Sequence, residues 1–124
     1  MSALDVKAKV VNGAAVIYPG IYLNQLRGEV IENQCEEFLD KGVRRLVINF
    51  AETELINSIG ISILLGVIET VNSANGTLFL SNLNETNREL FEMLGLTSHV
   101  HIEETEQTAL DKFYSQEECL QQAV

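Results

Sequence analysis

The residue of this sequence best placed for chemistry is a serine at the expected start of an apolar helix. Ser58 follows Asn57 and precedes Gly60, and the chain continues as Ile61-Ser62-Ile63-Leu64-Leu65. Asn57 can cap such a helix, because its side-chain carbonyl can accept a hydrogen bond from an amide of the first turn. Ser58 then lies at the positive end of the helix dipole, which favours an added anion such as a phosphate. The pattern predicts either a presented, phosphorylatable serine or an ordinary helix cap.

Other groups that could do chemistry form weaker patterns. Gly60-Ile61-Ser62-Ile63-Leu64 begins like the nucleophile elbow of esterases, but Leu64 stands where the last glycine belongs. His99 and His101 are two residues apart and are expected to share a strand face, yet no third ligand has a recognisable spacing. We therefore expect no catalytic residue, no metal and no cofactor.

The cysteines and the acidic run near the C-terminus suggest structural roles. Cys35 and Cys119 lie in helical patterns without metal-type spacing, which indicates reduced cysteines rather than a disulfide. Glu103-Glu104-Thr105-Glu106 comes at an expected helix start, where the helix dipole explains the acidic residues.

Composition limits the classes of function. The 124 residues are 46% hydrophobic, enough for one core, and 18 acidic against 8 basic residues give a net charge of −10. This charge opposes binding to nucleic acids and to anionic membranes, and suggests either solubility or a basic partner surface. The sequence shows no leader peptide and no apolar run long enough to insert into a membrane, so we expect a cytoplasmic protein.

The elements that must position Ser58 alternate between strands and helices. Asn12-Gly13 between two apolar runs predicts a two-residue hairpin turn, and Asn24, Asn84 and Thr105 are expected helix caps. Further strands are expected at 43–50, 77–80 and 100–102. The strand at 43–50 is apolar on both sides and therefore central, with Leu46, Ile48 and Phe50 on one face and Val47 on the other. The expected buried stripe of the helix after Ser58 consists of Ile59, Ile63, Val67 and Val71, with Leu64 and Ile68 beside them.

This order predicts a single-domain α/β fold over 1–124, with its core at about 5–114 and a fraying end from Gln116. Strands separated by single helices pair in parallel through right-handed crossovers. The sheet should therefore be mixed and mostly parallel, with an N-terminal antiparallel hairpin and helices packed against it.

In its motifs the chain resembles the STAS domains, the sulfate transporter and anti-sigma factor antagonist family, and most of all the free-standing bacterial anti-sigma factor antagonists. The resemblance covers roughly residues 5 to 114. It rests on these stretches, in this order: Pro19 with Leu23-Asn24, Leu46-Val47-Ile48-Asn49-Phe50, Asn57-Ser58-Ile59-Gly60-Ile61, Leu94-Gly95-Leu96 and Thr108-Ala109-Leu110.

The resemblance implies a switch protein rather than an enzyme. Such a domain binds a serine-kinase anti-sigma factor with a histidine-kinase-like ATPase fold, and the kinase phosphorylates a serine that matches Ser58 here. A metal-dependent serine phosphatase resets the switch. The implied partner-binding face consists of Tyr22, Leu23, Asn24, Asn57, Ser58, Gly60, Ile61 and Asn82.

The chain departs from the family pattern at two asparagines. Asn57 and Asn24 stand where the family usually has Asp, and Ile21 stands where it often has a glycine. The amide of Asn57 keeps the cap but loses a negative charge and a candidate acceptor for the serine proton. Two alternatives therefore stay open: a constitutive STAS adaptor subunit of a transporter or signalling scaffold that is not phosphorylated, and a small hydrolase that uses Ser58 or Ser62.

Overall fold

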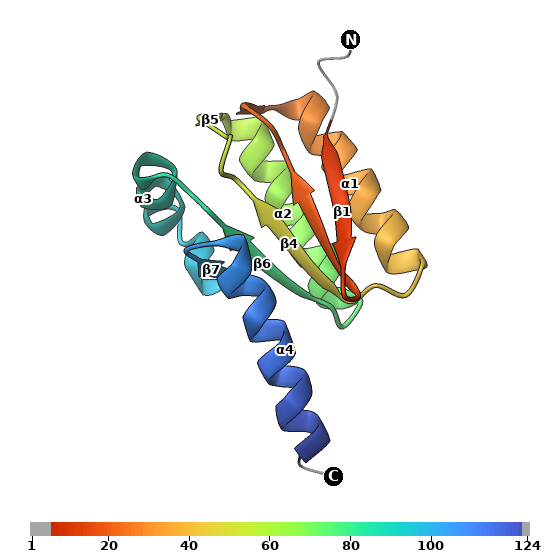
Figure 1. Ribbon diagram of the computed structural model, residues 1–124. Helices are drawn as coiled ribbons and strands as arrows, with labels where there is room; N and C mark the ends of the chain where they lie inside the picture. Colours follow the sequence, from red (N-terminus) through yellow and green to blue (C-terminus); the bar gives the residue numbers. More distant parts are fainter. Residues whose placement is uncertain (1–5, 123–124) are drawn as a thin grey trace.

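The structure, a computed structural model, describes the backbone of residues 6–122 and the side chains of residues 6–114. Its main sheet has five strands in the order β1-β2-β4-β6-β7. These strands are β1 (Lys7–Val11), β2 (Ala14–Tyr18), β4 (Arg45–Asn49), β6 (Thr77–Ser81) and β7 (His101–Glu103). β1 pairs with β2 antiparallel and all other neighbours pair in parallel, which confirms the predicted mixed sheet (Figure 1).

The hairpin turn forms where the sequence places it. Asn12 and Gly13 both have positive φ angles, 49° and 85°, as the favoured two-residue hairpin turn requires. The predicted caps also form: the side chains of Asn24, Asn57 and Asn84 each accept a hydrogen bond from a backbone amide three residues later. Local chemistry therefore fixes the ends of most elements.

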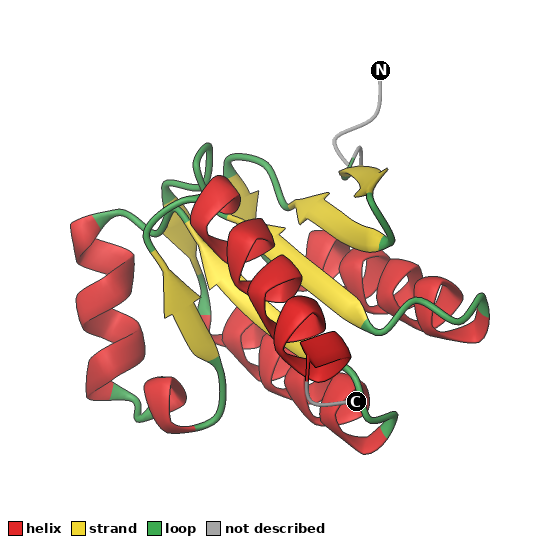
Figure 2. Ribbon diagram, turned by 60° about the horizontal axis from the view of Figure 1, so that its bottom comes forward, coloured by secondary structure: helices red, strands yellow, loops and turns green. Residues whose placement is uncertain are grey.

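Helices cover both faces of the sheet (Figure 2). They are α1 (Gln25–Asp40), α2 (Ser58–Ser73), α3 (Glu85–Met93) and α4 (Glu106–Gln122), with a 3-10 turn at Leu96–Ser98. α1 and α2 cover one face and α4 lies across the other (Figure 2). Helical backbone continues to Gln122, past the point from which fraying is expected, and residues 123 and 124 lie outside the described residues.

Two apolar clusters form the core, one on each side of the sheet. Leu46, Ile48 and Phe50 belong to the large cluster under α1 and α2, and Val47 belongs to the small cluster under α4, as predicted. The expected buried stripe of α2 is wrong at Ile59, which is 50% exposed. The buried face of α2 begins instead at Gly60, which packs against Leu23 of β3.

A second, two-stranded sheet was not predicted. β3 (Tyr22–Leu23) pairs in parallel with β5 (Leu55–Ile56), in segments whose sequence suggests only loops. Two residues are too few for a hydrophobic alternation to be visible. This small sheet lies at the end of the molecule where α2 begins, directly before Ser58 (Figure 1).

Glu106 attaches the start of α4 to the sheet. Its carboxylate accepts hydrogen bonds from the Tyr18 hydroxyl at 2.5 Å and the Asn49 amide at 3.0 Å, and pairs with Lys9 at 2.9 Å. Although burial opposes it, hydrogen bonds from Tyr18, Lys9 and Asn49 lower the pKa of Glu106. The helix dipole alone, the predicted explanation for this residue, is therefore insufficient.

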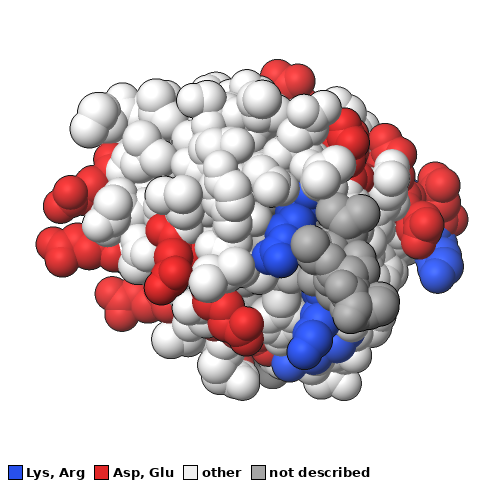
Figure 3. Space-filling model, turned by 90° about the horizontal axis from the view of Figure 1, so that it is seen from above, with Lys and Arg blue, Asp and Glu red and all other residues white. Residues whose placement is uncertain are grey.

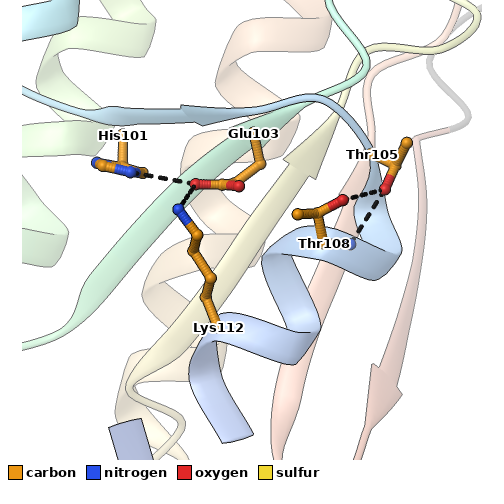
Figure 4. A network of polar contacts seen from close by, with 5 residues as sticks. All are labelled: His101, Glu103, Thr105, Thr108 and Lys112. Atoms are coloured by element: carbon orange, nitrogen blue, oxygen red, sulfur yellow. Dashed lines mark hydrogen bonds and ion pairs between the residues drawn. The ribbon is translucent and has the colours of Figure 1, made fainter. Parts of the chain in front are cut away.

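Glu103 makes a second attachment on the same side of the sheet (Figure 4). Its buried carboxylate lies 2.8 Å from the Lys112 ammonium and 3.1 Å from His101 Nε2. Thr105 caps α4 through the Thr108 amide at 3.0 Å, as predicted. Glu103 thus joins β7 to α4 by specific contacts. The helix dipole, which was the predicted explanation for this acidic residue, does not account for them.

Candidate functional site

Ser58 is the first residue of α2, and its side chain is exposed. Asn57 precedes it in an extended conformation, with φ −89° and ψ 173°, and its Oδ1 accepts the Gly60 amide at 2.7 Å. The serine is therefore presented to solvent by a capped helix, a geometry that fits both interpretations of the sequence. The first-turn position itself is confirmed; phosphorylation stays a prediction.

Gly60 allows α2 to begin directly against β3. A Cβ atom at this position would lie 2.5 Å from the Leu23 carbonyl oxygen, far inside van der Waals contact. The same carbonyl accepts a hydrogen bond from the backbone N–H of Asn57 at 3.1 Å. Leu23 and Gly60 are buried, so these two members of the predicted partner-binding face hold the start of α2 in place from beneath.

The loop between β4 and β5 is held by Thr53, which is only 2% exposed. Its hydroxyl donates to the Gly20 carbonyl at 2.6 Å, and its own carbonyl faces the side-chain amides of Asn84 and Asn87, each at 3.4 Å. These contacts tie together the loop before β3, the loop before β5 and the start of α3. Ser58 therefore lies on a rigid support built from three segments.

Tyr22 contacts the cap directly. The side-chain nitrogen of Asn57 donates to the Tyr22 hydroxyl over 3.2 Å, and both residues are half-buried. Asn24 instead uses its side chain to cap α1, where it accepts the Arg27 amide at 3.0 Å. The sequence grouped Tyr22 and Asn24 with Ser58 only through the family resemblance, and no motif indicates the contact between Tyr22 and Asn57.

Asn82 follows directly after β6. Its φ angle of 61° is left-handed, and its buried Oδ1 has no hydrogen-bond partner among the described residues. No hydrogen bond among the described residues joins Asn82 to Ser58. Its place in the partner-binding face stays a prediction.

A groove of about 510 Å³ opens beside Ser58, between the start of α2 and α3. Among the described residues, none of those that line it is charged. Its lining residues are Ile56, Asn57, Ser58, Ile61, Leu90 and Leu94. Ile61, a predicted contact residue, therefore takes part in the groove, whereas Leu90 and Leu94 were not among the predicted contact residues.

The surface around the groove is apolar and bordered by charged groups of both signs. Ile21, Leu55, Ile59 and Leu94 are each at least half exposed, with fractions of 55%, 59%, 50% and 52%. Figure 3 looks down on the end of the molecule where β5 and the start of α2 lie, and shows a broad uncharged area with both acidic and basic side chains at its margin. Large exposed apolar patches with a polar rim are typical of protein interaction sites.

The arrangement does not suit the hydrolase or metal interpretations. Ser62 lies on an exposed turn of α2, and no histidine lines the groove at Ser58. His99 follows the 3-10 turn, whereas His101 lies in β7, so the expected shared strand face is wrong. Within the described residues no group of three metal-ligating side chains comes together.

Cys35 is buried in the large core cluster, and burial raises the pKa of its thiol to about 12. This fits the predicted structural cysteine; the side chain of Cys119 lies outside the described ones. Within residues 6–122, no helix is both long enough and apolar enough to cross a bilayer.

The chain belongs to the STAS domain family, which it matches over residues 5–109. It is 29% identical over 91 residues to BtrV of Bordetella bronchiseptica, a protein named for a candidate role as an anti-sigma factor antagonist. That match covers 73% of this chain and 78% of BtrV.

Solved structures show the same fold. TM1081 of Thermotoga maritima superposes with a TM-score of 0.79 at 21% identity, over 86% of this chain and 92% of TM1081. The phosphorylated form of SpoIIAA, a Bacillus cell fate determinant, superposes with a TM-score of 0.70 at 22% identity, over 88% of this chain and 99% of SpoIIAA. SpoIIAA is also described as an anti-sigma factor antagonist.

Proposed function

We propose that this chain is an anti-sigma factor antagonist that acts in the cytoplasm through partner switching. In this proposal it binds a serine-kinase anti-sigma factor of the histidine-kinase-like ATPase fold, and the kinase phosphorylates Ser58. A metal-dependent serine phosphatase removes the phosphate. The chain is then a regulator without a reaction of its own.

The observation that carries this proposal is an exposed serine at the first position of a capped helix, within an uncharged apolar face. Ser58 is accessible to a kinase, while the side chains around it provide apolar area for a complex. The membership of the STAS family and the likeness to BtrV support the same role.

A phosphate on Ser58 would be a sufficient switch. It would add about −1.5 to −2 charges to a groove whose lining has none. One unit charge about 5 Å from a partner carboxylate costs about 3 kcal/mol at an effective dielectric constant of about 20. This is roughly two decades of affinity, which is enough to release a micromolar complex.

The test is affinity purification of the tagged protein from its native cells, with mass spectrometry of the bound chains and of the peptide that holds Ser58. The proposal expects a small kinase of the ATPase type, a gain of about 80 Da, as one phosphoryl group requires, on Ser58 alone, and release of the kinase by Ser58→Asp. Ser62→Asp, on the exposed part of the same helix, is the control. Equal binding by wild type and Ser58→Asp would refute the switch.

One observation favours a second candidate, the constitutive adaptor. The residue before Ser58 is an amide whose two polar atoms are both engaged, one by Gly60 and one by Tyr22, so it offers no carboxylate to accept the serine proton. Recovery of transporter or scaffold subunits, with Ser58 always unmodified and binding independent of ATP, would support the adaptor instead.

A further inference from the structure

The helix cap fixes which atom of the Asn57 side chain faces Tyr22. Asn57 Oδ1 accepts the Gly60 amide at 2.7 Å, and only the carbonyl oxygen of an asparagine can accept such a bond. The amide nitrogen therefore faces the Tyr22 hydroxyl, 3.2 Å away, and donates to it. Because the phenolic oxygen is the acceptor in this pair, its own proton is left for another acceptor.

That proton has no acceptor among the described residues. Tyr22 is a half-buried residue of β3, and its only described side-chain hydrogen bond is the one from Asn57. A tyrosine hydroxyl at such a position normally finds a partner. The hydroxyl is also polarised, since a hydroxyl that accepts a hydrogen bond becomes a better donor.

We propose that Tyr22 donates a hydrogen bond to an anionic oxygen at the Ser58 site and is a specificity-determining residue of that site. The proposal rests on the proposed function, because a phosphorylated or partner-bound Ser58 brings such an oxygen next to Asn57. Two sources supply this chemistry: a phosphoryl oxygen on Ser58 itself, or a carboxylate oxygen of the partner.

A neutral donor suits a site beside a groove for which the described lining side chains carry no charge. Charge-assisted hydrogen bonds to phosphate or carboxylate are about twice as strong as neutral ones, so a phenol is an effective contact for an anion. A lysine or arginine at position 22 would carry a charge, and a partner bound over unmodified Ser58 would bury that charge without an anion to pair with it. Tyr22 thus stabilises an anionic oxygen, and its neutral hydroxyl has only a small desolvation penalty when no anion is present.

The first arm of the test needs no kinase. Phosphoserine is placed at position 58 of the full chain during translation, and its second pKa is measured by ³¹P NMR titration in the wild-type and Tyr22→Phe backgrounds. Donation from Tyr22 favours the dianion, so Tyr22→Phe should raise this pKa by about half a unit. Tyr114→Phe is the matched control, because Tyr114 also accepts from an asparagine, Asn12, but at the far end of the sheet.

The second arm measures affinity of the unphosphorylated chain for the co-purified partner. A fall of about tenfold in Tyr22→Phe, about what loss of one charge-assisted bond gives, with an unchanged phosphoserine pKa assigns the anionic oxygen to the partner. A shifted pKa assigns it to the phosphate on Ser58. If neither quantity changes, the proposal is wrong. The phosphoserine titration keeps its meaning even if no kinase acts on Ser58, so its result is separate from the proposed function.

Discussion

Gly60→Ala should destabilise the fold, although alanine is the better helix former. The added Cβ would lie 2.5 Å from the Leu23 carbonyl oxygen and 3.1 Å from Leu23 Cγ, so α2 must move away from β3. Overpacking of this kind costs about 1–3 kcal/mol. The shift also weakens the hydrogen bond from the backbone N–H of Asn57 to the same carbonyl, and such a bond contributes about 1 kcal/mol to stability. Against this, replacing glycine by alanine in a helix gains about 1 kcal/mol.

The expected net loss is therefore about 1–3 kcal/mol in the free energy of unfolding, which urea titration followed by circular dichroism measures. Gly66→Ala is the matched control, since Gly66 lies in the same helix and its added Cβ would meet only Glu32 Oε2, at 3.8 Å. This control should be stabilised by about 0.5–1 kcal/mol. The reasoning fails if both variants gain stability equally, because close approach at Leu23 would then not limit position 60.

Three further perturbations test other parts of the structure. Asn57→Ala removes the helix cap and should lower the unfolding free energy by about 1 kcal/mol. Asn57→Asp should keep the cap and be phosphorylated faster by the co-purified kinase, because a carboxylate can accept the serine proton. An equal phosphorylation rate in Asn57→Asp and wild type would argue against a role for a carboxylate. The pKa of Glu106 is lowered in the fold, so its contribution to stability is present above its unfolded pKa of about 4.5 and is lost as pH falls through the lower folded value. The unfolding free energy of Glu106→Gln should therefore fall less steeply with decreasing pH than that of wild type. Equal dependence of the unfolding free energy on pH in the two proteins would contradict this. Phe113→Ala should lower the unfolding free energy, measured by urea titration, by about 3–5 kcal/mol, because Phe113 is fully buried and stacks on Phe79 with 4.6 Å between ring centroids. A loss below about 1 kcal/mol would show that α4 contributes little to the stability of the fold.

Much of the fold could be predicted because its signals are local. The turn at Asn12-Gly13 and the caps Asn24 and Asn57 each depend on residues at most three positions away. The central strand is visible because both of its faces are apolar, and parallel pairing follows from the intervening helices. The first-turn position of Ser58 follows from the same local rules.

The site was only partly predictable because its other contacts join distant segments. Tyr22 lies 35 residues from Asn57, and Asn49 lies 57 residues from Glu106. No spacing in the sequence indicates either contact. Ile59 was placed in the buried stripe because it fits the helical period, but that period does not show where the sheet ends beneath the helix.

The sequence by itself determined the order of the elements, their caps and the serine at the start of α2, since these depend on backbone hydrogen bonds that side chains close in sequence can satisfy. Only the tertiary structure decided what surrounds that serine. The pairing of β3 with β5, the glycine pressed against the Leu23 carbonyl and the hydrogen bond from Asn57 to Tyr22 all need two segments brought together by the packed core. Burial of that core fixes their distance, and the local sequence carries no record of it.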